Sequence, residues 1–271
     1  MSYVALARYL GEEQPFYGLQ VAHLDENERA ETRLKTMAAE YLAAVRVVQP
    51  EGPYWLGGWS MGGIVAFEMA QQLQQEGQPV ALLALLDSWT PDSDPRYPAG
   101  YHLPTQPQPV GAELETQLLI DFLRHLRSRY AKELPPLPDD FRQLGPHEKL
   151  PYILEHAQML EQVFPEGGLS QLHRLLQVFK ANVRAMSSYV PQVYRGRVVL
   201  FQASEWFAAA NHPHGQMPDS STDWQRLSTE PLLVRPVPGD HYTMLAEPNI
   251  RVLAEQLKLC LHEMELMGVA K

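Results

Sequence analysis

A serine between glycines is the first candidate for chemistry in this chain. Residues 58–62 read G-W-S-M-G, which fits the pattern G-x-S-x-G. A short apolar run, 53–56, precedes the motif, and an apolar pattern of helical period, 64–73, follows it. Strand, tight turn and helix in that order form a nucleophile elbow, which exposes a serine hydroxyl at the end of a sheet. The pattern predicts Ser60 as a nucleophile and the Met61 backbone N–H as an oxyanion donor.

A serine nucleophile needs a base, and the base needs an orienting acid. After the predicted helix, Gly77 is placed to cap its C-terminus, and residues 80–86 form a continuous apolar run. Such a run is typical of a parallel strand buried on both faces. Asp87 follows directly, so its carboxylate is expected at the same sheet edge as Ser60. Asp87 is therefore the candidate acid.

The candidate base is His241, one of ten histidines. It follows the last strand-like run, 232–237, and a turn at 238–240, so the loop can bring it back over the strand ends. The chain order serine, acid, histidine is that of α/β-hydrolase triads. Asp240 is a rival acid, but a residue adjacent to a histidine points poorly at the imidazole Nδ1, and Asp87 is preferred.

No metal site is expected. His212 and His214 form a pair in a polar loop, but the loop has no cysteine and no third spaced ligand. The other histidines considered lack acid–base partners in the pattern and are interpreted as surface or packed residues: His23, His125, His156, His173 and His262.

Three motifs resemble the type I thioesterase domains that end nonribosomal peptide and polyketide synthases. They are G-G-W-S-M-G-G at 57–63, L-L-D-S-W at 85–89 and G-D-H-Y-T-M-L at 239–245. Segments 6–11, 15–20 and 195–205 are similar to the family as well. The resemblance implies an α/β-hydrolase fold, with a mostly parallel sheet and helices on both faces. It also implies the triad Ser60, Asp87 and His241.

The family resemblance also implies a reaction and a partner. We expect a thioesterase that releases an acyl or peptidyl chain from a carrier protein through a serine acyl-enzyme, by hydrolysis or macrocyclisation. The partner is an acyl or peptidyl carrier protein domain, which carries the phosphopantetheine arm, so no bound cofactor is expected. Two alternatives stay open: a general serine esterase acting on oxygen esters, and an inactive truncated remnant.

The front of the chain departs from the family. Residues 1–6 resemble the middle of the family's first helix, whereas the family begins with a central strand and a loop that supplies the second oxyanion N–H. We therefore expect the N-terminal central strand to be missing. One explanation, which we favour, is that the chain is a piece of a longer protein or has a start codon assigned too late. The other is a natural truncation that fills the gap another way.

Periodicity predicts one α/β domain over 1–271, with a strand over 16–21 and a helical stripe from Leu34 to Val48. After Asp87 the alternation stops, and a proline-rich connection leads into three helical stripes. We interpret about 92–194 as a helical lid inserted into the domain. The stripes are Leu114, Leu118, Phe122 and Leu126; Leu150, Ile153, Ala157 and Leu160; and Leu172, Leu175, Phe179, Val183 and Met186.

Composition restricts the other function classes. The net charge of −10 argues against a nucleic-acid partner. No apolar run approaches the roughly 20 residues of a membrane span, and no signal peptide is recognisable. Cys260 is the single cysteine, so no intrachain disulfide can form, and a reducing cytoplasm is the expected location. Cys260 also falls on an apolar helical stripe, which indicates a core residue rather than a nucleophile.

Overall fold

The computed structural model describes residues 3–20, 30–91, 118–123, 125–126, 144–145, 148–149, 168–205 and 219–266. The chain divides into two compact units, one formed by residues 1–105 with 185–271 and the other by residues 106–184. The sheet and all the predicted triad residues belong to the first unit.

Four strands form one parallel sheet in the order β1-β2-β3-β4. They are β1 (Tyr54–Trp59), β2 (Val80–Leu86), β3 (Val198–Ala203) and β4 (Leu233–Val237). The apolar run predicted as a buried strand is β2, and six of its residues are buried. In the register, Leu86 pairs with Trp59 on one side and with Phe201 on the other. The residues that follow β1 and β2 therefore lie side by side at the C-terminal end of the sheet.

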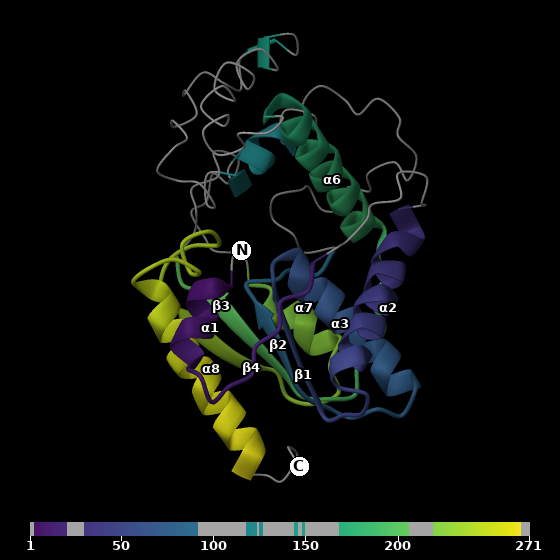
Figure 1. Ribbon diagram of the computed structural model, residues 1–271, viewed down its shortest axis with the longest axis vertical. Coiled ribbons are helices and arrows are strands. Elements are labelled where there is room, and N and C mark those ends of the chain that lie inside the picture. The colour runs from purple at the N-terminus through teal and green to yellow at the C-terminus, as the bar shows by residue number, and fades with distance from the viewer. Residues whose placement is uncertain are drawn as a thin grey trace. The chain divides into compact units, whose positions relative to one another are not determined.

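Helices cover both faces of this sheet (Figure 1). On one face lie α1 (Val4–Leu10) and α8 (Asn249–Leu266), and on the other lie α2 (Ala30–Val48) and α3 (Met61–Gln75). The short helix α7 (Ser221–Arg226) packs near α3, because the Trp224 ring lies 5.0 Å from that of Phe67. The prediction of an α/β fold with helices on both faces is confirmed.

Alternation along the strands divides the core between the two faces. Leu82, Ala84 and Leu86 pack with side chains of α1 and α8, including Leu6 and Leu253. Their neighbours on β2 point to the opposite face, because successive strand side chains alternate. Cys260 lies in the α8 part of this core, and burial raises the pKa of its thiol, as expected of a packed residue.

The C-terminus of α3 has the predicted glycine cap. Gly77 has a φ of 72°, its N–H donates to Gln74 O, and the N–H of Gln78 donates to Leu73 O at 2.9 Å. These two bonds form a Schellman motif, which satisfies carbonyl groups that the helix end would leave without partners.

The strand predicted over 16–21 is wrong for the part that the structure describes. Residues 15–20 have no regular structure, and the side chains of Phe16, Tyr17 and Leu19 are 37%, 70% and 39% exposed. Apolar alternation makes a strand only where a neighbouring strand accepts and donates its backbone bonds. Among the described residues, no such neighbour flanks this segment.

The helical stripe of α2 holds except at its C-terminal end. Leu34 and Met37 are buried, Tyr41 and Val45 are half-buried, and Val48 is 57% exposed. Arg46, in the last turn of α2, contacts Glu76 at the end of α3. The residues of α2 after Arg46 therefore extend beyond the C-terminus of α3, and among the described residues Val48 has no helix to pack against there.

The outer edges of the two edge strands, β1 and β4, differ in which side chains bind their backbone groups. On β4, the carbonyl of Pro236 accepts a hydrogen bond of 2.9 Å from Gln256 Nε2 on α8. On β1, the N–H of Trp59 donates to the hydroxyl of Tyr3 at 2.9 Å, whereas Gly57 is exposed. No strand pairs with this outer edge of β1 in the described part of the chain.

The second unit is described in part. Its residues include helical turns at 118–123 and most of α6 (Gly168–Ser188), and the rings of Phe122 and Phe179 lie 5.6 Å apart. The third predicted stripe falls on α6, whereas the stripe from Leu150 to Leu160 lies outside the described residues. A lid over about 92–194 stays a prediction.

The close approach of β1 to the start of α3 generates a stability test. A Cβ at Gly58 would lie 2.1 Å from the backbone C and O of Gly62, and no rotamer change relieves a contact with backbone. Gly58→Ala should lower the free energy of unfolding by at least about 2 kcal/mol. Gly62→Ala is the matched control, since its Cβ meets only the Tyr3 hydroxyl at 3.4 Å. That variant should stay within about 1 kcal/mol of the parent in urea unfolding; equal effects would contradict the packing argument.

Candidate active site

Ser60 occupies a strained turn between β1 and α3. Its φ of 56° and ψ of −125° are rare for a residue with a Cβ, and such strain is common at functional sites. The Ser60 N–H donates to Leu86 O at 2.9 Å, which extends the β1–β2 ladder to the nucleophile. Met61 is the first residue of α3, where backbone N–H groups have no partner within the helix. The role of its N–H as an oxyanion donor stays a prediction.

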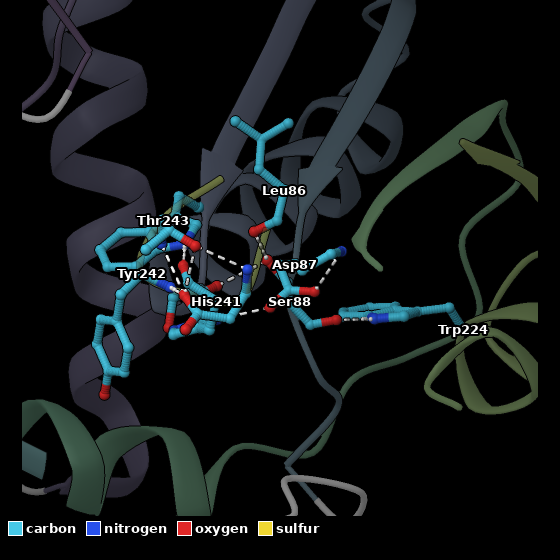
Figure 2. Close-up of polar contacts among 11 residues, drawn as sticks. Leu86, Asp87, Ser88, Trp224, His241, Tyr242 and Thr243 are labelled. Atoms are coloured by element: carbon cyan, nitrogen blue, oxygen red, sulfur yellow. Dashed lines mark hydrogen bonds and ion pairs between the residues drawn. The ribbon is translucent and has the colours of Figure 1, made fainter. Parts of the chain in front are cut away.

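Ser88 stabilises the elbow through a hydrogen bond to its backbone. Its Oγ donates to the Ser60 carbonyl at 2.8 Å, and its own carbonyl accepts a 2.7 Å bond from Trp224 Nε1 (Figure 2). An added Cβ at Gly63 would lie 2.0 Å from Ser88 Oγ, so Gly63 leaves the space that this hydroxyl occupies. Sequence analysis did not identify Ser88 or Trp224 as contributors.

Asp87 is held by backbone bonds from the neighbouring strand. Its φ is 44°, its N–H donates to Phe201 O at 2.7 Å, and its Oδ1 accepts from the Ala203 N–H at 2.9 Å. The second oxygen, Oδ2, lies 2.7 Å from His241 Nδ1 (Figure 2). The carboxylate is thus buried with both oxygens engaged, as a residue that orients an imidazole must be.

His241 lies on a loop built by its own polar groups. Asp240 Oδ1 accepts hydrogen bonds from the N–H groups of Tyr242 and Thr243 and from Thr243 Oγ1, at 2.8 to 2.9 Å. Gly239 has a φ of 88°, which starts the turn. The rival acid Asp240 therefore organises the loop, and the structure brings Asp87 to the imidazole instead.

Two tryptophans, also missed by sequence analysis, flank the imidazole. The ring centroid of Trp59 lies 4.8 Å from that of His241, and that of Trp89 lies 4.9 Å away. Trp59 Nε1 also donates to the His241 carbonyl at 2.9 Å. Because Trp59 precedes Ser60 in the chain, this contact brings the His241 loop to the elbow. The segments that carry Ser60, Asp87 and His241 thus converge at the end of the sheet.

Of the other histidines, only some lie in the part of the chain that the structure describes. His212 and His214 lie outside the described residues, as do His23 and His156. His173 Nε2 lies 3.2 Å from Gln177, and His262 pairs with Glu265 on exposed α8 surface. In the described ranges, no group of three His, Cys, Asp or Glu residues is arranged to hold a metal ion. The helices described there include none long and apolar enough to cross a membrane.

Comparison with known proteins gives a consistent family. Residues 1–258 match the family model "Thioesterase domain". Chondramide synthase of Chondromyces crocatus is 30% identical over 264 residues, which cover 96% of this chain and 6% of that protein. A four-domain nonribosomal peptide synthetase, solved with AMP and glycine, matches with a TM-score of 0.73 and 26% identity, over 95% of this chain and 18% of its own. The chain thus spans a small part of these large relatives.

The chain is also similar to a solved thioesterase domain whose length is close to its own. The NocB thioesterase domain, in covalent complex with a fluorophosphonate nocardicin G analogue, is 25% identical with a TM-score of 0.52. The match covers 88% of this chain and 77% of that one.

The elbow geometry predicts the outcome of removing the nucleophile. Ser60→Ala should abolish labelling by a serine-directed fluorophosphonate and lower turnover on the order of 10⁶-fold, as in related triads. Ser204→Ala serves as the control for fluorophosphonate labelling, since this exposed serine lies outside the elbow and its loss keeps the Ser60 hydroxyl. Labelling that persists in Ser60→Ala would assign the nucleophile to another residue.

The two aspartates near His241 should respond differently to amide substitution. Asp87→Asn should lower turnover on the order of 10⁴-fold, because an amide favours the wrong imidazole tautomer. Asp240→Asn keeps the Oδ1 acceptor of its loop and should cost much less. Steady-state turnover of the two variants ranks them, and the reverse order would overturn the assignment of Asp87.

Proposed function

The chain belongs to the thioesterase domain family, and we propose that it releases an acyl or peptidyl chain from the phosphopantetheine arm of a carrier protein in natural-product biosynthesis. The observation that carries the proposal is the 2.7 Å contact between Asp87 Oδ2 and His241 Nδ1 beside the Ser60 elbow. An Nδ1 that faces a carboxylate carries the proton, which leaves the Nε2 lone pair for a serine hydroxyl.

Acylation transfers the chain from sulfur to Ser60. Ser60 Oγ attacks the thioester carbonyl while His241 takes the hydroxyl proton, and Asp87 stabilises the imidazolium that forms. The oxyanion receives a hydrogen bond from the Met61 N–H. When the C–S bond breaks, His241 returns the proton to the departing thiol, and an ester at Ser60 remains.

Deacylation decides the product. His241 takes a proton from the incoming nucleophile, which attacks the Ser60 ester, and gives that proton back to Ser60 Oγ. Water as the nucleophile yields an acid, whereas a hydroxyl or amine of the same acyl chain yields a ring. The triad serves both outcomes equally, so the shape of the acyl site selects between them.

The partner in this proposal is an acyl or peptidyl carrier protein domain, and the proposed location of the reaction is the cytoplasm. The phosphopantetheine belongs to that partner, and the triad needs no cofactor of its own. The chain has a net charge of −10, and carrier proteins are usually acidic too. Docking therefore relies on a local complementary patch rather than on bulk attraction.

The test compares two esters of one acyl group. An acyl thioester on a carrier protein and the p-nitrophenyl ester of the same acid are given to the chain and to Ser60→Ala. We expect kcat/KM to favour the carrier thioester by at least about tenfold, because binding of the carrier contributes to the transition state. Preference for the aryl ester would indicate a general esterase. Failure with both esters and with a fluorophosphonate would indicate an inactive module.

A further inference from the structure

We propose that Trp59 and Trp89 are positioning residues that clamp His241 and stabilise its protonated form during acyl transfer. The inference rests on the proposed function, because it assigns His241 the role of general base there. It goes beyond the triad, since neither indole takes or gives a proton.

The contacts place both indoles against the imidazole. The Trp59 ring is inclined by 30° to His241 with centroids 4.8 Å apart, and the Trp89 ring by 36° at 4.9 Å. Both distances are within the roughly 6 Å over which an aromatic face attracts a cation. Tyr242, by contrast, meets the imidazole edge-on, at 83° and 5.0 Å.

The clamp is built from the elements that carry the catalytic residues. Trp59 is the last residue of β1, directly before Ser60, and Trp89 follows Asp87 by two positions, after β2 has ended at Leu86. The Trp59 indole is fixed at a second point by its 2.9 Å hydrogen bond to the His241 carbonyl. The position of the Trp59 ring therefore follows from the sheet, and Trp89 lies on the segment that leaves β2.

The two indoles act on the positive charge that develops on His241 when it takes a proton. The His241 side chain is 1% exposed, so an imidazolium there loses nearly all contact with water. Burial of a cation is costly unless neighbouring groups compensate. Asp87 compensates at Nδ1, and the electron-rich indole faces attract the charged ring more strongly than the neutral one.

Among the described residues, the other titratable groups placed next to the imidazole, Asp240 and Tyr242, come from the same loop. Asp240 has its Oδ1 engaged by Tyr242 and Thr243, and Tyr242 presents its ring rather than a charge. Removal of an indole face should thus act on the His241 titration directly, with Asp87 still in place.

The experiment measures that titration by NMR on histidine-labelled protein, with His241 assigned by its loss in His241→Gln. Leucine keeps an apolar side chain but has no π face. Trp59→Leu and Trp89→Leu should each lower the titration midpoint of His241 by roughly 0.4 to 1.5 pH units. Trp59→Phe and Trp89→Phe should each shift it less. Trp55→Leu is the matched control, since Trp55 lies on the same strand roughly 13 Å from Trp59, and should leave the midpoint unchanged.

A second measurement keeps the proposal testable if a leucine variant does not fold. Biosynthetic fluorotryptophan withdraws electron density from the indole face with little change in volume, so it should lower the midpoint progressively with each added fluorine. A midpoint unchanged by fluorination and by the folded leucine variants would overturn the clamp. The readout needs no substrate. A preference for oxygen esters would therefore contradict the proposed function alone, and an unmoved midpoint in an active thioesterase would contradict the clamp alone.

Discussion

The contact of backbone with backbone where β1 turns into α3 is the constraint on which the site depends. Gly58 lies so close to Gly62 that a single methyl group would separate the strand from the helix. This closeness permits the positive φ of Ser60 and sets its carbonyl against the Ser88 hydroxyl. Strain at the serine is thus maintained by packing on both sides of it.

Asp87, which follows the neighbouring strand, is held in a strained conformation in the same way as Ser60. It also has a positive φ, and backbone groups of β3 bind both its N–H and its Oδ1. The orientation of its second oxygen toward His241 is therefore a property of the β2–β3 register. Ser60 and Asp87, the proposed nucleophile and acid, are each held by the sheet, whereas His241, the proposed base, lies on a loop that Asp240 stabilises from within.

Much of this arrangement could be predicted from the sequence, where local pattern determines structure. The run 80–86 is apolar throughout and bounded by turn residues, so β2 could be placed to the residue. Residues 15–20 could not, because a strand also needs a neighbour to pair with. The indoles beside His241 were missed for a related reason: Trp59 and His241 are distant in sequence, and no periodicity encodes their contact.

The sheet is chemically unequal at its two edges. Strand N–H and C=O groups of one residue point to the same side, so the outward carbonyl of Pro236 stands beside a ring nitrogen that has no hydrogen. Gln256 already occupies that carbonyl. The β4 edge therefore offers, at this position, neither donor nor acceptor to an approaching chain, as natural sheets often arrange at an edge. At β1 the exposed Gly57 carries no such block. Of these two positions, the one on β1 therefore leaves the sheet edge more open than the one on β4.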